Sequence, residues 1–213
     1  MNIKSLGLAA AALFGATALA GAACAAPVIT VSSIDTPLPA GQFMIDDFDN
    51  PIANGFAFSP ANVRSGSLGL DSGVSAPPPG DLTNYETVLG GTSATLTTPN
   101  GLHSLSIFLG SPDDYNSITF LGGTVGDLTL SGPNLFYPAT AFGGDQSIGR
   151  RVTYDFGAGD FTSVVFSSGS NSFEFDNIAG SVPEPSSWAL MLVGVGALGF
   201  ALRRRPALAQ AAA

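Results

Sequence analysis

In Leu105-Ser106-Ile107-Phe108-Leu109, and again in Ser172-Phe173-Glu174-Phe175-Asp176, an apolar side chain stands at every second position. Successive side chains of an extended strand point to opposite faces of a sheet, so this spacing predicts strands with one buried and one solvated face. The same period of two recurs through the central part of the chain, and turn residues interrupt it about every eight to twelve positions. The pattern is typical of an all-β domain.

The expected strands cover residues 42–48, 92–97, 102–109, 117–121, 127–130, 151–156, 161–166 and 172–178. Typical loop and hairpin sequences separate them, namely Gly90-Gly91, Pro99-Asn100-Gly101, Gly110-Ser111-Pro112-Asp113-Asp114, Gly122-Gly123 and Gly143-Gly144-Asp145. No stretch in this region predicts an amphipathic helix. Two packed antiparallel sheets are therefore expected, as a jelly-roll-like β-sandwich.

The run Ala76-Pro77-Pro78-Pro79-Gly80 is too stiff and too poor in backbone donors to form a strand. It is expected to be an exposed loop. A linker between two domains is the alternative, but the residues before it are few and rich in glycine.

The C-terminal part has a different character. Val182-Pro183-Glu184-Pro185-Ser186-Ser187 precedes an uncharged apolar run over residues 188–202, and Arg203-Arg204-Arg205 follows. The prolines predict an extended, accessible stalk. As a helix the run is roughly 23 Å long against a hydrocarbon core of about 30 Å, which is short for a membrane span. The segment can still cross the bilayer if residues 182–187 add to its length, the arginine side chains reach the interface and the bilayer thins locally. We therefore expect a transmembrane helix over residues 188–202.

Arginines next to a membrane span stay on the cytoplasmic side, so Arg203, Arg204 and Arg205 predict that everything before Val182 lies outside. The alternative is a buried helix of a globular domain. That helix would have to hide an apolar surface on all sides while ending in three arginines.

The order of Pro-Glu-Pro, short apolar run and arginine cluster resembles the PEP-CTERM sorting signal of Gram-negative bacteria, carried here by residues 182–205. The resemblance implies that a membrane-embedded exosortase recognises Pro183, Glu184 and Pro185 and cuts near them. The ectodomain would then pass to the cell surface or the extracellular matrix. Residues 206–213 extend past the arginines, where family members often stop sooner, and are expected to form a cytoplasmic tail.

The second half of the central region also resembles the ectodomains of a group of exosortase-dependent surface proteins. The segments that carry this resemblance are residues 85–91, 110–118, 149–152 and 171–178. Because the group is defined by its sorting, the resemblance implies no ligand or activity.

The N-terminus predicts export. Residues 1–19 hold one early cation, Lys4, followed by a run of alanine and leucine, and Ala23-Cys24-Ala25 matches a small-x-small cleavage site. Residues 1–25 are thus expected to be a signal peptide, used by the Sec machinery and removed by signal peptidase. A lipoprotein at Cys24 is the alternative, although Gly21-Ala22-Ala23 lacks the usual large aliphatic residue. Cys24 is the only cysteine and would be removed with the signal peptide. Disulfides and cysteine catalysis are therefore not expected in the mature chain.

These signals leave residues 26–181 for one domain, expected to be periplasmic while the chain is anchored in the inner membrane and later displayed or secreted. Of the 16 acidic residues all but Glu184 lie in it, against Arg64, Arg150 and Arg151 and no lysine. Nucleic acid should be repelled by such a surface. The acidity favours either solubility alone or sites for calcium.

Catalysis is not expected. His103 is the only histidine and shares a strand face with Leu105 and Ile107, which favours a packed or edge position over a general base. No serine stands in a Gly-x-Ser-x-Gly elbow, and zinc needs more His or Cys ligands than the chain offers. A paired-carboxylate glycosidase is the one scheme left by the composition, but the acids lie mainly in turn sequences.

Two acidic clusters predict a possible calcium site, formed by Asp46, Asp47 and Asp49 with Asp176 and Asn177. The arrangement resembles sugar-binding jelly-roll modules, in which the first and last strands often lie together and a Phe-Asp-Asn sequence supplies oxygen ligands. Calcium takes six to eight oxygen ligands at about 2.3–2.6 Å. The alternative is that these acids cap strand ends.

Carbohydrate binding needs exposed aromatic side chains, and the tyrosines are only Tyr85, Tyr115, Tyr137 and Tyr154. The phenylalanines suit a core. We therefore expect a structural protein of the surface or extracellular matrix, with an exopolysaccharide-binding module as the alternative.

Overall fold

The computed structural model describes residues 26–33, 36–110, 113–136, 149–183 and 187–203. Several expected features lie outside these residues: the signal peptide, Tyr137, the loop at residues 143–145, Glu184, Pro185, Arg204, Arg205 and the tail at residues 206–213.

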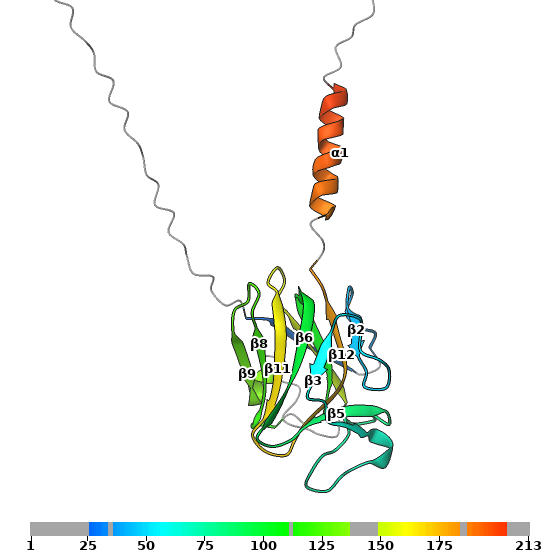
Figure 1. Ribbon diagram of the computed structural model, residues 1–213, viewed down its shortest axis with the longest axis vertical. Coiled ribbons are helices and arrows are strands. Elements are labelled where there is room, and N and C mark those ends of the chain that lie inside the picture. Colours follow the sequence, from blue (N-terminus) through cyan, green and yellow to red (C-terminus); the bar gives the residue numbers. More distant parts are fainter. Residues whose placement is uncertain (1–25, 34–35, 111–112, 137–148, 184–186, 204–213) are drawn as a thin grey trace, which may run out of the picture.

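Two antiparallel sheets pack face to face, and the expected β-sandwich is confirmed (Figure 1). The seven-stranded sheet runs β1 (Val28–Ser33), β10 (Arg150–Asp155), β7 (Ser104–Leu109), β12 (Phe173–Ser181), β5 (Asn84–Val88), β4 (Val63–Ser65), with β2 (Phe43–Asp46) also paired to β12. The five-stranded sheet runs β3 (Ala57–Ser59), β6 (Thr92–Leu102), β11 (Phe161–Ser168), β8 (Asn116–Leu121), β9 (Leu128–Ser131). Short 3-10 turns cover Gly66–Leu68 and Gly132–Leu135.

The core lies between the two sheets and is rich in aromatic rings. Phe173 and Phe175 are both fully buried with ring centroids 5.3 Å apart, as their spacing of two predicts. Phe120 on the other sheet meets the rings of Phe156 and Phe161 edge-on, at 4.8 and 5.0 Å. Edge-to-face contacts of this kind add stability beyond the area that they bury.

Each expected strand falls on an observed one, whereas β1, β3, β4 and β5 were not expected. Pro99-Asn100-Gly101, expected to be a loop, instead lies inside β6. The pairing of β6 with β11 shifts register there, between Phe161 and Ser163. Gly101 has a φ of 77°, and its N–H donates to Thr98 Oγ1 at 3.1 Å, so a glycine absorbs the irregularity.

The outer face of the seven-stranded sheet is not solvated as the alternation predicts. Every residue of β7 is buried, and so are Glu174 and Asp176 of β12. The loop at residues 66–83, which joins the paired strands β4 and β5, contacts this face: the N–H of Ala76 donates to Glu174 at 3.0 Å. Pro78 is buried, so the proline run is a loop but not an exposed one.

Helix α1 (Ser187–Arg203) follows the last strand and is drawn outside the sheets (Figure 1). The apolar side chains of residues 191–200 are exposed. Within the part of the chain that the structure describes, no helix combines the length and the apolar character needed to cross a membrane, so the transmembrane helix expected at residues 188–202 is not confirmed.

Candidate functional site

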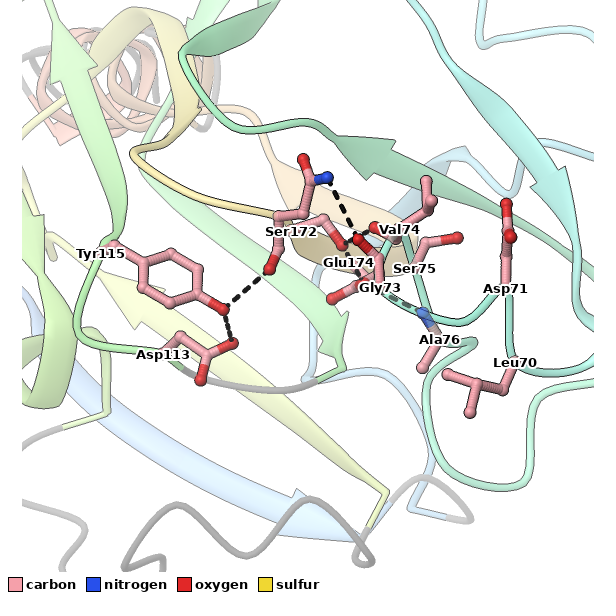
Figure 2. A pocket seen from close by; sticks show the side chains of 11 residues that line it. Leu70, Asp71, Gly73, Val74, Ser75, Ala76, Asp113, Tyr115, Ser172 and Glu174 are labelled. Carbon is pink, nitrogen blue, oxygen red and sulfur yellow. Dashed lines mark hydrogen bonds between the residues drawn. The ribbon is translucent and has the colours of Figure 1, made fainter.

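A hollow of about 190 Å³ lies where the loop at residues 66–83 meets the sheet (Figure 2). Residues 70–76 of this loop form one wall. The other wall is formed by Asp113 and Tyr115, just before β8, and by Asn171, Ser172 and Glu174, around the start of β12. Segments far apart in sequence thus contribute polar groups to one small concave surface, which is how ligand sites are commonly built.

Tyr115 is the aromatic side chain of this hollow and has 39% of its surface exposed. Its hydroxyl lies 2.8 Å from Asp113 Oδ2 and 3.0 Å from the carbonyl oxygen of Asn171, and its one hydrogen is shared between these two acceptors. Burial of the hydroxyl, together with its hydrogen bond to Asp113, raises the pKa of Tyr115 to about 12. The phenol therefore stays protonated and serves to hold the ring in place.

Glu174 forms the floor of the hollow and is buried. Its Oε1 accepts the N–H of Ala76 and also contacts Ser172 Oγ, which itself donates to the carbonyl of Val74 at 2.7 Å. The one hydrogen of the Ser172 hydroxyl is shared between Glu174 Oε1 and the carbonyl of Val74. Burial raises the pKa of Glu174.

The remaining contacts tie the loop to the sheet. Asn171 Nδ2 donates to the carbonyl of Gly73 at 3.3 Å, and Ser75 Oγ lies 3.1 Å from the hydroxyl of Tyr85. Arg64 of β4 forms an ion pair with Asp71 of the loop, with 2.6 Å between Arg64 NH1 and Asp71 Oδ2. Asn171 Oδ1 also accepts the N–H of Gly90 at 2.8 Å. The resemblance segments at residues 85–91, 110–118 and 171–178 therefore meet around this hollow.

The acids expected to bind calcium only partly come together. Strand β2 lies beside β12, with Asp46 opposite Ile178. Asp46 Oδ1 accepts the N–H of Phe48 at 2.9 Å, and burial raises the pKa of Asp46. Asp47 Oδ1 accepts the backbone N–H of Asn50 at 2.9 Å, and Asp47 Oδ2 accepts the side-chain amide of Asn50 at 2.8 Å. Burial opposes ionisation of Asp47, but these hydrogen bonds outweigh it and lower its pKa.

Asp49 is exposed, and its Oδ1 accepts the N–H of Asn84 at 3.3 Å. The first acidic cluster is thus engaged in local turns and caps. Among the described residues, no group of three or more His, Cys, Asp or Glu side chains is placed to hold a metal.

Asp176 has partners that the sequence did not suggest. It is fully buried, and its two oxygens accept the backbone N–H and side-chain amide of Asn177, each at 2.6 Å. Its other neighbours are Thr83, at 3.3 Å, and Asp81. Burial, with the nearby charge of Asp81, raises the pKa of Asp176 to about 8. The proline run just before Asp81 was predicted to be an exposed loop, and no pattern in it signals that this segment packs against β12.

His103 lies between β6 and β7, partly buried, as a packed or edge histidine. Its Nε2 is 2.8 Å from Ser181 Oγ, which also contacts the hydroxyl of Ser104. Both serines are buried, at 3% and 5% exposure.

The sorting residues that the structure describes are accessible. Val182 and Pro183 are exposed directly after β12, and Arg203 is exposed at the end of α1. Because β12 ends at Ser181, Val182 and Pro183 lie outside the sheets.

A family model for the PEP-CTERM protein-sorting motif matches residues 181–205. Such a motif implies export, anchoring at the membrane in transit, and processing by an exosortase. No curated protein matches the chain in sequence.

Two solved structures are similar at low scores. The first is the catalytic unit of a thermostable GH87 α-1,3-glucanase from Streptomyces thermodiastaticus strain HF3-3, with 12% identity and a TM-score of 0.32, over 60% of this chain and 26% of that one. The second is the family 11 carbohydrate-binding module of the cellulase Lic26A-Cel5E of Clostridium thermocellum, with 12% identity and a TM-score of 0.27, over 67% of this chain and 95% of that one. The chain spans about a quarter of the glucanase unit, and neither likeness bears on activity.

Proposed function

We propose that this chain, a PEP-CTERM protein by its sorting motif, is a structural protein of the cell surface or extracellular matrix that an exosortase frees by cutting at Pro183-Glu184-Pro185. The observation that carries the proposal is where the motif begins. It starts at Ser181, the last residue of β12, and among the described residues the buried hydrophobic side chains of the sandwich extend no further along the chain than Ala179. Cleavage in the exposed segment that follows leaves a complete sandwich.

Processing can be tested in a host that carries the exosortase. The secreted protein should have an intact mass that lacks both the N-terminal 25 residues and the segment around α1. Pro183→Ala should leave the chain in the membrane fraction, because the altered tripeptide is no longer recognised. Pro206→Ala, which lies outside the matched residues, is the control and should be processed normally. Release of the Pro183→Ala variant at the normal rate would count against recognition of the tripeptide.

We also infer that the domain is not an enzyme. His103 is engaged by a buried serine, and Glu174 is held by the backbone of the covering loop. General acid–base catalysis needs a titrating group that reaches a substrate, and neither side chain offers one. Hydrolysis of polysaccharides by the purified protein, lost in Glu174→Gln, would refute this inference.

The hollow at Tyr115 favours a second candidate, the binding of exopolysaccharide. A hollow of about 190 Å³ beside an exposed tyrosine is a place where a sugar ring can stack. Binding on a glycan array should fall in Tyr115→Ala. Phe43→Ala, at a similar exposure of 37%, should bind like the wild type. If no glycan on the array binds, the carbohydrate-binding candidate is refuted and only the structural role remains.

A further inference from the structure

Two buried carboxyl groups face each other between the sheet and its covering loop. Asp176 belongs to β12 and has no exposed surface, whereas Asp81 belongs to the loop at residues 66–83 and is 7% exposed. The hydroxyl of Thr83 contacts both carboxyl groups, Asp81 at Oδ1 and Asp176 at Oδ2, the latter at 3.3 Å. Two carboxylates that share one hydroxyl repel strongly in a buried place unless a proton or a cation lies between them.

The surrounding donors satisfy some of the carboxyl oxygens but not all. Thr83 donates its N–H to Asp81 Oδ1 at 2.8 Å, and its hydroxyl contacts the same oxygen. Asp81 Oδ2 is buried and has no hydrogen-bond partner among the described residues. An orphaned buried carboxylate oxygen is costly, because it has lost its water without replacement.

Arg151, whose charge interacts with that of Asp176, does not fill this role. Arg151 stabilises Asp176 by its charge, but its NH1 donates to the carbonyl of Asn177 at 2.9 Å and to Ser106 Oγ at 3.2 Å. Its Nε has no partner among the described residues, so the guanidinium is not locked onto either carboxylate. Arg151 therefore leaves Asp81 Oδ2 without a cationic partner in the described part of the chain.

We propose that Asp81, Asp176 and Thr83 form a binding site for a hard divalent cation of the calcium type. Two carboxylates and a hydroxyl are oxygen ligands of the kind calcium takes, and two carboxylates balance its charge. The site differs from the one expected from the sequence, because Asp81 takes the place of Asp46, Asp47 and Asp49. A cation here would join the loop at residues 66–83 to β12 and so fix one wall of the hollow at Tyr115.

The full chain, purified in mild detergent and stripped with EDTA, provides the test. Calcium chloride should raise its melting temperature, and isothermal titration should show one site. Metal content after gel filtration should approach one calcium per chain. Binding should weaken by at least about tenfold in Asp81→Asn and in Asp176→Asn. Asp127→Asn, at an exposed acid away from the loop, should bind like the wild type.

Titration of the wild type decides the matter even where a variant fails to fold. No calcium-dependent rise in melting temperature and no heat of binding in the wild type would overturn the proposal, and the two carboxyl groups would then share a proton. Calcium binding that persists undiminished in both Asp81→Asn and Asp176→Asn would place the cation elsewhere and overturn it as well.

Discussion

Phe166 of β11 and Phe175 of β12 stack across the interface of the two sheets, with ring centroids 4.4 Å apart and an interplanar angle of 28°. Both side chains are fully buried. The contact joins strands from different sheets, so it reports on the packing of the sandwich as a whole.

Replacing Phe175 by Ala should lower the free energy of unfolding by about 3–5 kcal/mol, because it removes a buried ring and leaves a cavity. Phe173→Ala should cost a similar amount, since both rings lie on the core face. Chemical denaturation of the full chain measures the loss. Phe43→Ala, at a ring that is 37% exposed, should cost clearly less. A loss below about 1 kcal/mol in Phe175→Ala would contradict the core described above.

Glu86 predicts a dependence of stability on pH. Both oxygens of its carboxyl group contact the N–H of Asn62, at 3.0 and 2.9 Å, but burial dominates and raises its pKa from 4.5 to about 7. The folded state therefore holds a proton that the unfolded state releases above pH 4.5. The stabilisation is complete below that pH and is lost as the pH rises to about 7, by on the order of 2–3 kcal/mol.

Glu86→Gln removes this titration while it keeps the shape of the neutral group. Near pH 5 the variant should match the wild type, and near pH 8 it should unfold at higher denaturant concentration. The difference between the two proteins reports on Glu86 together with its coupling to Asp46, whose charge adds to the rise in the pKa of Glu86, whereas Glu174 titrates in both proteins. Parallel stability curves across this range would show that Glu86 is ionised in the folded state.

The sequence predicted the strands whose apolar residues alternate over five or more positions, such as those around Ile107 and Phe175. It did not predict β3 and β4, which have three residues each and too few positions to show a period. Strand β5 was missed because Glu86 occupies a buried position where the pattern requires an apolar residue. The alternating pattern within a strand thus predicts which of its side chains enter the core.

The alternation of apolar residues does not predict the candidate site, because the site depends on which segment covers the outer face of the sheet. Alternation in β7 and β12 predicts a solvated face and contains no sign that a distant loop will bury it. Thr83 and Asp176, which are in contact, are 93 positions apart in the sequence. The sorting signal lies at the other extreme: its residues are contiguous, so the sequence alone was enough to predict it.

One methyl group added at Gly149 is expected to displace the loop at residues 66–83 that covers the sheet. A Cβ on Gly149 would lie 2.5 Å from the carbonyl oxygen of Pro79 and 3.0 Å from the ring of Phe108, and a backbone atom cannot yield cheaply at that distance. Gly149→Ala should therefore push the proline run away from the sheet and lower stability by about 1–3 kcal/mol. Limited proteolysis should then cut within residues 66–83. Gly194→Ala in α1, where a Cβ meets nothing within 4 Å, is the control. An unchanged digestion pattern in Gly149→Ala would show that the loop does not rest on Gly149.

Cleavage by the exosortase should cost the sandwich no stability, because the strand that precedes the motif is complete before the motif's prolines begin. Gly180 and Ser181 still pair with Leu105 and Ser104 of β7, and the carbonyl of Ser181 accepts the N–H of His103 at 3.0 Å. A chain that stops at Pro183 keeps all of these contacts. Its melting temperature should match that of the full chain.

A chain that stops at Ile178 loses the pairing of Ala179 with β2 and with β7, and it leaves His103 without the hydroxyl of Ser181. Backbone groups of β2 and β7 then lose their partners, so the melting temperature should fall by several degrees, as expected for a loss of about 1–2 kcal/mol in a domain of this size. Calorimetry on the full chain and the two shorter ones makes the comparison. Equal melting temperatures for the chains ending at Pro183 and at Ile178 would show that the end of β12 is dispensable, and a lower value for the chain ending at Pro183 would mean that the sorting segment itself supports the fold.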